Sequence, residues 1–328
     1  MLKISKISFP GLGIGEFEVD SVAFELPWFG GETLEIAWYA LLITIGMILA
    51  TTFIILSAKR IGITADDVID FALLVIPIGV VGARLYYVFS KFEQYHSFYD
   101  VINIRDGGLA IYGGIITGGL TVVAVCYFKK INFFAFADHV APGVILAQGI
   151  GRWGNFMNGE AFGYATDWFC RMGLENNLTG HELTFVHPTF LYESLWNIAG
   201  FAIAALLIKR KRQDGQIFLL VFGWYGFGRM FIEGLRADSL YLFNTSIRVS
   251  QLLAFIIFIV SVAGILYLQF TKNVRPFFHK SARLPAHTDG NSFESKKETK
   301  IKKLDSDTTN SGAFESKTKS NKKSKKGK

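Results

Sequence analysis

Seven apolar stretches, each about as long as a membrane-spanning helix, recur along this chain of 328 residues. A helix needs about 20 apolar residues to cross the hydrocarbon core of a bilayer. The chain is also 51% hydrophobic and contains 31 phenylalanines, which is more apolar than is usual for a water-soluble protein of this length. We therefore predict an all-α, polytopic membrane protein with seven spans, at residues 36–57, 68–90, 109–128, 133–151, 190–208, 217–233 and 250–270.

The charges between the spans give the predicted protein a direction in the membrane. Lys59 and Arg60 follow the first span, Lys129 and Lys130 follow the third, and KRKR at 209–212 follows the fifth. Basic loops stay on the cytoplasmic side. We expect an external N-terminus, a cytoplasmic C-terminus, and an extracytoplasmic loop region between spans four and five. Span four counts as a span although Asp138, His139 and Pro142 interrupt it, because its charges lie near one end.

The chain divides into three parts by composition. Residues 1–35 form an acidic extracytoplasmic segment, residues 36–271 form the seven-span membrane domain, and residues 272–328 form a basic tail with 16 Lys/Arg against 6 Asp/Glu. The tail is too polar to fold, so we expect disorder. It could attract anionic lipid of the inner leaflet, at about 1 kcal/mol per nearby lysine, or be a solvated tail with no specific role. Because the basic charge belongs to the tail, no nucleic-acid partner is predicted.

Only two cysteines occur, Cys126 in an apolar stretch and Cys170 in a polar loop, so we predict no structural disulfide. The first residues lack a continuous apolar stretch and a small-residue cleavage site, so no signal peptide is predicted.

Polar side chains from six of the spans collect at one predicted depth, on the outer side. A charged residue at the centre of a membrane helix costs roughly 2.5–3.5 kcal/mol, so such residues normally face the bundle interior or water. Along the sixth span, Tyr225, Arg229, Glu233 and Arg236 fall close to one helical face. The full set is Tyr39, Arg84, Tyr112, Arg152, Asn155, Asn158, Glu160, His187, Tyr192, Glu193, Arg229, Glu233 and Arg236.

Each of these residues also has an interpretation without function. Arg84 and Arg236 could extend to the interface and hold lipid headgroups nonspecifically. Arg229 and Glu233 could form a structural ion pair at i,i+4. Tyr39, taken alone, fits an ordinary aromatic anchor at the membrane surface.

The same caution applies to the loop residues. Asn155 and Asn158 could do no more than cap a turn, since GNFMNG supplies residues that tolerate positive φ. His187, directly before Pro188, could simply end a loop.

Several arginines balanced by glutamates, facing outward within a bilayer, suit an anionic amphiphile. The planar guanidinium matches phosphate oxygens bidentately, and phosphatidylglycerol is an abundant lipid of that kind. If a bond to the phosphate breaks, arginine also stabilises the charge on the leaving group. The chain has no HExxH, Cys/His metal cluster, G-x-S-x-G or phosphate loop. We therefore predict no metal and no cofactor, and expect any nucleophile to arrive with the second substrate.

Three motifs resemble the signatures of the prolipoprotein diacylglyceryl transferase family. They are GRWGNFMNGEAFG at 151–163, HPTFLYE at 187–193 and YGFGRMFIEGLR at 225–236. WYALLITIG at 38–46, GARLYYV at 82–88 and DGGLAIYGG at 106–114 are also similar, and the resemblance covers about residues 36–270.

This resemblance implies a multi-pass enzyme of the bacterial plasma membrane. It would transfer the diacylglyceryl group of phosphatidylglycerol to the lipobox cysteine thiol of a prolipoprotein, forming a thioether and releasing glycerol 1-phosphate. The implied catalytic residues are Arg152, Arg229, Tyr112 and Glu233. The implied substrate-binding residues are Arg152, Asn155, Glu160 and Tyr39, and the shared predicted depth adds Asn158, Arg84, His187, Glu193 and Arg236.

Tyr112 marks a departure from the family pattern. Some members have a histidine before the glycine pair, where this chain reads Tyr112-Gly113-Gly114, and that histidine has been proposed as the base for the thiol. Tyrosine, with an ordinary pKa of about 10, is a poor base. Either Tyr112 only positions the substrate, or an arginine lowers the pKa of the thiol, as neighbouring cations do.

Two other function classes compete with the transferase. A lipid or small-anion transporter would often show internal repeats and a site near the midplane, whereas no repeat is visible here and the polar set lies toward one face. A receptor or assembly factor without catalysis is the third possibility.

Overall fold

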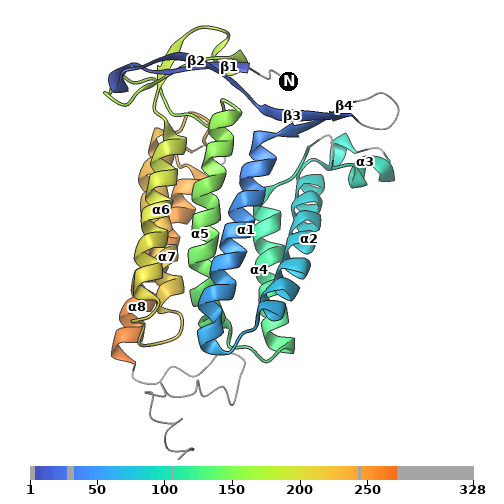
Figure 1. The fold of residues 1–328 in the computed structure, drawn as a ribbon, viewed down its shortest axis with the longest axis vertical. Helices are drawn as coiled ribbons and strands as arrows, with labels where there is room; N and C mark the ends of the chain where they lie inside the picture. The colour runs from blue at the N-terminus through green and yellow to red at the C-terminus, as the bar shows by residue number, and fades with distance from the viewer. Residues whose placement is uncertain (1–3, 28–32, 96, 105–106, 243–244, 272–328) are drawn as a thin grey trace, which may run out of the picture. The chain divides into compact units, whose positions relative to one another are not determined.

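The computed structural model describes residues 4–27, 33–95, 97–104, 107–242 and 245–271 (Figure 1). Within them, seven helices are long and apolar enough to cross a membrane, which confirms the predicted number of spans and a multi-pass membrane protein. They are α1 (Trp38–Ala58), α2 (Ala65–Ser90), α4 (Ile111–Phe128), α5 (Phe133–Met157), α6 (Thr189–Leu207), α7 (Gln216–Leu235) and α8 (Val249–Phe270). The predictions for the tail, residues 272–328, lie outside the described residues.

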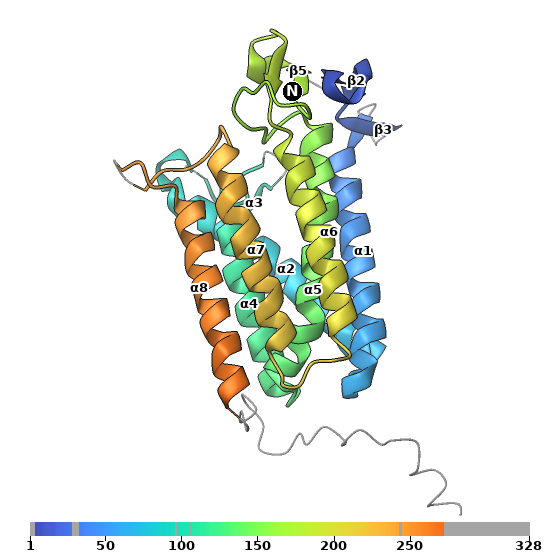
Figure 2. The ribbon, with the colours of Figure 1, turned by 90° about the vertical axis from the view of Figure 1, so that its left-hand side faces the viewer.

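Helix α5 is the inner helix of the bundle. It packs against α1, α6 and α7, while α7 pairs with α8 and α2 pairs with α4 (Figures 1 and 2). The most apolar part of α5 is 56% buried, against 11% for α8. This burial explains why α5 can carry Asp138 and Arg152 at its two ends, since polar groups in a span need protein partners.

The expectation of an all-α fold is incomplete, because two small antiparallel sheets lie at the end of the bundle where α1 begins (Figure 1). One sheet has the order β2-β1-β5-β6 and the other pairs β3 with β4. We call this the strand end of the bundle. The strands are β1 (Ile4–Phe9), β2 (Ile14–Asp20), β3 (Val22–Pro27), β4 (Thr33–Ala37), β5 (Met172–Glu175) and β6 (Thr184–Val186). The remaining α-helix in the described residues is the short α3 (Phe98–Ile102).

The four-stranded sheet has its own apolar core. In β1, Ser5, Ile7 and Phe9 are buried while the residues between them are more exposed, the alternation expected of a strand with one buried face. Ile7 and Phe9 pack with residues from β2, β5, β6 and the start of α6. The sheet therefore covers the end of α5 and α6, next to the polar motifs.

Helix α5 extends beyond the predicted end of the fourth span at residue 151 and stops at Met157. Arg152 and Asn155 consequently lie on the last turns of the helix and not in the loop after it. The helix can continue through these polar residues because their side chains bind to protein groups, as described below. It ends where Gly159 adopts a left-handed conformation, φ +60°.

At the opposite end of the bundle, α5 caps α7 through a side chain. Gly215, the residue before α7, has no side chain to accept a hydrogen bond. The buried carboxylate of Asp138 replaces it, accepting from the backbone N–H groups of Gly215 and Phe218 at 2.8 Å each. Lys211 Nζ neutralises Asp138 at 2.8 Å and Asp214 at 3.0 Å. Burial lowers the pKa of Lys211, but the two carboxylates outweigh burial and raise it, so the ammonium stays charged.

Removing this carboxylate should destabilise the bundle. We expect Asp138→Ala to lower the free energy of unfolding by about 3–5 kcal/mol, because it leaves a buried lysine and two helix N–H groups short of an acceptor. Thermal unfolding in detergent measures the effect. Asp70→Ala is the matched control, since the side chain of Asp70 pairs with Lys129 but is 53% exposed. Equal losses for the two variants would contradict the prediction.

Candidate active site

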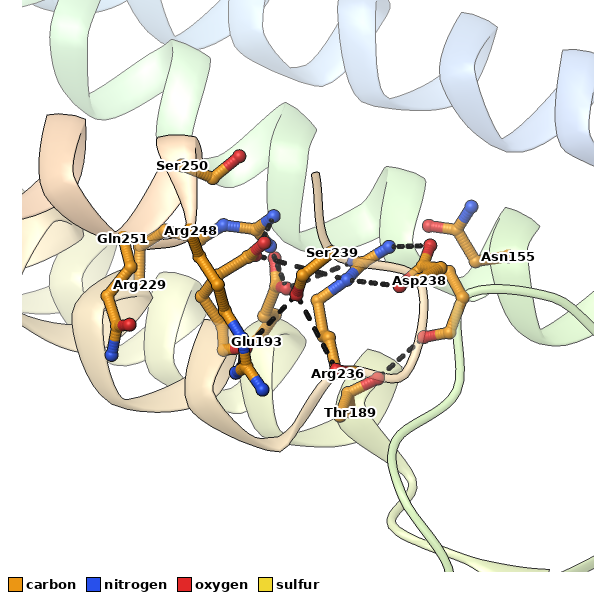
Figure 3. Close-up of polar contacts among 12 residues, drawn as sticks. Asn155, Thr189, Glu193, Arg229, Arg236, Asp238, Ser239, Arg248, Ser250 and Gln251 are labelled. Atoms are coloured by element: carbon orange, nitrogen blue, oxygen red, sulfur yellow. Dashed lines mark hydrogen bonds and ion pairs between the residues drawn. The ribbon is translucent and has the colours of Figure 1, made fainter. Parts of the chain in front are cut away.

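Glu193, on the second turn of α6, is the centre of an ion cluster at the strand end of the bundle (Figure 3). Its side chain is 3% exposed. Oε2 lies 2.6 Å from Arg152 Nη2 of α5, Oε1 accepts from Arg229 Nη1 of α7, and Arg236 Nη1 lies 3.6 Å from Oε1. One buried carboxylate thus joins arginines from two other helices.

Glu233 holds the other side of the same arginines. Its side chain is 2% exposed, and Oε2 lies 2.5 Å from Arg229 Nη2 and 4.0 Å from Arg236 Nε. Arg229 therefore bridges Glu193 and Glu233 with two different nitrogens. Neither Glu193 Oε2 nor Glu233 Oε2 accepts a well-aligned hydrogen bond within the described residues, although both lie in ion-pair contact.

The cluster has more positive than negative charge in its buried part. Three guanidinium groups face the two buried carboxylates, and their side chains are 11–18% exposed. Asp238 provides a further carboxylate at the rim of the cluster, where its side chain is 51% exposed. It accepts two hydrogen bonds from Arg236, from Nε to Oδ1 at 2.9 Å and from Nη2 to Oδ2 at 2.5 Å. Bidentate contact with an oxyanion is the geometry by which arginine also binds phosphate.

The turn after α5 extends the cluster toward the sheet. Arg152 Nη1 donates to Asn155 Oδ1 at 3.4 Å, and the side-chain amides of Asn155 and Asn158 both donate to Glu160 Oε1 at 3.1 Å. These asparagines therefore hold Glu160. Asn155 and Asn158 do not have positive φ; the residues of this turn that do are Gly159, at +60°, and Ala161, at +57°.

The turn after α5, residues 158–161, is also held by residues from other parts of the chain. Asn176 Nδ2 donates to the carbonyl of Gly159 at 2.8 Å, and Thr189 Oγ1 of α6 donates to the carbonyl of Ala161 at 2.6 Å. A Cβ on Gly159 would lie 2.4 Å from Ser5 Oγ of β1, so only glycine fits there. Residues of β1, of the segment directly after β5 and of α6 thus hold the turn that carries Glu160.

Four of the predicted catalytic and substrate-binding residues lie outside this ion cluster: Tyr39, Tyr112, Arg84 and His187. Tyr39, on the first turn of α1, packs its ring against Gly154 of α5, where a Cβ would come within 2.4 Å of the ring. Tyr112, near the start of α4, has its hydroxyl 3.4 Å from Ser250 Oγ of α8. Tyr39 therefore lies beside α5, which carries Arg152, and Tyr112 lies beside α8.

Arg84 of α2 is engaged by backbone. Its guanidinium donates to five carbonyl oxygens of the segment between α2 and α4 at 2.6–2.9 Å, those of Asp100, Val101, Asn103, Gly107 and Gly108. The side chain is buried and lies over the ring of Tyr95. In this structure, Arg84 organises that segment. Its predicted role in substrate binding stays a prediction.

His187 belongs to a chain of polar contacts beside the cluster. Its Nδ1 lies 3.3 Å from the hydroxyl of Tyr192, which lies 3.1 Å from Cys170 Sγ. Burial lowers the pKa of His187, so its imidazole is neutral at pH 7. Cys126 and Cys170 are both free, as the sequence predicts.

Three residues near the start of α8 contact the site and are absent from the sequence-based set. Arg248 donates through Nη1 to the carbonyl of Glu233 and through Nη2 to the hydroxyl of Tyr164 at 3.2 Å. Gln251 donates to the carbonyl of Met230 at 2.9 Å. Ser250 lies next to them (Figure 3), and its Oγ lies 3.4 Å from the hydroxyl of Tyr112. A basic residue at the start of an otherwise apolar span was the available signal for Arg248.

Nothing in the described residues is arranged as a metal centre: no group of three or more His, Cys, Asp or Glu is placed to hold an ion there. The cluster is suited instead to binding an oxyanion among arginines. Two of these arginines, Arg152 and Arg229, lie one on each side of Glu193.

Comparison with known proteins gives one family. Residues 27–267 match the family model described as prolipoprotein diacylglyceryl transferase. A protein of Enterococcus faecalis named phosphatidylglycerol–prolipoprotein diacylglyceryl transferase is 44% identical over 272 residues, covering 79% of this chain and 94% of the relative. Similarly named proteins of Clostridium perfringens and Limosilactobacillus reuteri are 42% and 43% identical, covering 76% of this chain each and 94% and 93% of the relatives.

Proposed function

Because the chain belongs to the prolipoprotein diacylglyceryl transferase family, we propose that it transfers the diacylglyceryl group of phosphatidylglycerol to the lipobox cysteine of a prolipoprotein. The observation that carries this proposal is the meeting of Arg152, Arg229 and Arg236 at the buried carboxylate of Glu193. Guanidinium groups bind phosphate bidentately, so three of them at one site suit an anionic lipid headgroup.

The reaction exchanges a carbon–oxygen bond for a carbon–sulfur bond. The acceptor sulfur attacks the diacylglyceryl carbon that carries the phosphate, the thioether forms, and the electron pair of the broken carbon–oxygen bond leaves on glycerol 1-phosphate. The thiol proton passes to water before or during this attack. We assign Arg152 and Arg229 to the charge that develops on the leaving phosphate oxygen, since preorganised donors stabilise such charge. Glu193 and Glu233 hold the two guanidinium groups in place.

The remaining residues of the set are assigned to substrate binding. We assign Arg236 to the headgroup at the rim of the cluster. A bound phosphate there would replace Asp238 as the acceptor of the two hydrogen bonds from the Arg236 guanidinium. The others are assigned from the family resemblance or from their predicted depth, and Arg84 is included although its guanidinium binds backbone carbonyls. They are Tyr39, Arg84, Asn155, Asn158, Glu160, His187 and Glu193.

A headgroup-release assay tests the function. Purified protein in vesicles of phosphatidylglycerol should release glycerol phosphate only when a lipobox peptide is added, with one lipidated peptide formed per headgroup released. A peptide with serine in place of the cysteine is the control and should give neither product. Release without an acceptor would indicate a hydrolase that cleaves the headgroup from the lipid, in the manner of a phospholipase C, and movement of intact lipid without release would indicate a transporter.

Tyr112 is assigned a positioning role, with the arginines favouring the thiolate form of the acceptor. We expect Tyr112→Phe to keep turnover within about tenfold of the parent, because only its contact with Ser250 is lost. The same release assay, run across pH 6–9, measures this. A general base contributes about 10²–10⁴-fold, so a loss in that range would make Tyr112 the proton acceptor instead.

The direction of the protein in the plasma membrane of a bacterium is also part of the proposal. Lys59, Lys129 and the basic residues 209–212 follow the ends of α1, α4 and α6 that lie away from the strands. Positive loops favour the cytoplasm, so the strand end and its arginines should face outward, the side on which a secreted acceptor arrives.

Thiol labelling checks this direction. In a Cys170→Ser background, a membrane-impermeant maleimide should label Glu18→Cys of β2 in intact cells, because this strand position is exposed. Arg212→Cys, exposed in the loop before α7, should react only after the membrane is opened. The reverse pattern would place the active site in the cytoplasm and contradict the proposal.

A further inference from the structure

The same five-residue pattern occurs on two facing helices. Residues 196–200 of α6 read WNIAG and residues 224–228 of α7 read WYGFG, so each helix has a tryptophan followed one turn later by a glycine. The two helices run in opposite directions and pack against each other (Figures 1 and 2). Each tryptophan therefore lies opposite the glycine of the other helix.

The two tryptophans bind each other reciprocally. Their rings are stacked, with centroids 4.3 Å apart and planes at 16°. Trp196 Nε1 donates to the carbonyl of Trp224 at 2.9 Å, and Trp224 Nε1 donates to the carbonyl of Trp196 at 2.8 Å. Both indole N–H groups are thus satisfied inside the protein, as a span requires.

Each ring fits only because the facing residue is glycine. A Cβ on Gly200 would lie 2.4 Å from Trp224 Cδ1, and a Cβ on Gly228 would lie 2.1 Å from Trp196 Nε1. Atoms without a bond between them cannot approach so closely. We call Trp196, Gly200, Trp224 and Gly228 the tryptophan clasp. Small residues allow close approach of membrane helices, and here they also seat the partner ring.

The clasp adjoins the ion cluster on both helices. Glu193 lies three residues before Trp196, and Arg229 directly follows Gly228. The pair Glu193–Arg229 and the pair Trp196–Trp224 are successive layers of the same helix–helix contact. A slide of α6 against α7 would therefore disturb both layers together.

We propose that the tryptophan clasp positions the active site by fixing the axial register of α6 against α7, so that Glu193 meets Arg229. Apolar side chains alone can pack in several registers of the two helices. The two reciprocal hydrogen bonds, and the two glycines against which the rings pack, are compatible with only one register. A helix advances 1.5 Å per residue, and a displacement of about 1 Å at a reacting centre can lower a rate by about 100-fold. The inference rests on the proposed function, since it assigns Arg229 to the leaving phosphate.

Substitution at the glycine seat tests the proposal. Gly228→Ala should push the indole of Trp196 away and lower kcat per folded molecule by about 100-fold, with a KM for phosphatidylglycerol within a few-fold of the parent. The double variant Gly228→Ala/Trp196→Leu should regain about tenfold of that kcat but stay below the parent. Leucine has no atoms at the Nε1 and Cε2 positions that meet the new Cβ, while Trp224 keeps its contact with Gly200 and its hydrogen bond to the carbonyl of residue 196.

A glycine with free space around it provides the control. Gly119→Ala, in α4, adds a Cβ with nothing within 4 Å and should keep the parental kcat. A parent that transfers no lipid would remove the proposed function itself. A working parent with an equally active Gly228→Ala variant, or a double variant as slow as the single one, would overturn the positioning role alone.

Discussion

Replacing Arg229 with lysine is expected to lower kcat/KM for diacylglyceryl transfer by about 10²–10³-fold. Arg229 contacts Glu193 with Nη1 and Glu233 with Nη2, and we assign its guanidinium to the leaving phosphate oxygen. A lysine keeps the charge, but its single ammonium cannot make these contacts from one plane. Arg152→Lys should lose a similar factor, because Arg152 faces the other oxygen of Glu193.

The headgroup-release assay with a lipobox peptide measures both variants, and peptide lipidation provides a second reading. Arg60→Lys is the matched control, since Arg60 is exposed near the end of α1 away from the strands. Its turnover should equal that of the parent. Parental turnover by Arg229→Lys and Arg152→Lys would show that charge alone suffices and would remove the bidentate role assigned to them.

The helices of this fold could be predicted from the sequence because length and apolarity decide a membrane span without reference to its neighbours. The largest error in a boundary has a physical cause. The fourth span was predicted to end at residue 151, yet α5 continues to Met157. Arg152 and Asn155 are tolerated on the helix because Glu193 and Glu160 receive their side chains, and no local pattern announces such distant partners.

The strands show the same limit. The segment ISKISF at 4–9 alternates apolar and polar residues only at Ile7-Ser8-Phe9, because Ile4 is exposed and Ser5 is buried, so it was a weak signal for a strand. The pairing of β1 with β5 was not available, because it joins Lys6 to Glu175, which lies 169 residues further along the chain. Such a sheet forms only when the folded chain brings these distant segments together, so neither segment predicts it alone.

Depth in the membrane was a useful but incomplete guide to the site. It selected Glu193, Arg152 and Arg229, which the structure brings together. It also selected Arg84, whose donors are used by backbone carbonyls, because depth does not distinguish a carboxylate partner from a carbonyl partner. It omitted Arg248, because a lone arginine at the start of a span looks like an interfacial residue.

Replacing Glu193 with glutamine should impair stability and catalysis together. The carboxylate is buried and faces Arg152, Arg229 and Arg236. Without its charge, three partly buried guanidinium groups repel one another, and removal of one member of a buried ion pair costs about 3–5 kcal/mol. We expect a corresponding fall in the free energy of unfolding in detergent, and a kcat at least as low as that of Arg229→Lys.

The variant should also respond to lipid differently from the parent. A bound phosphate supplies the negative charge that the glutamine lacks, and a ligand stabilises the folded state that binds it. Phosphatidylglycerol should therefore raise the thermal midpoint of Glu193→Gln more than that of the parent, whereas a zwitterionic lipid should raise neither. Glu182→Gln is the control, since Glu182 is exposed in the loop before β6. Equal responses of Glu193→Gln and the parent would mean that the headgroup does not bind among these arginines.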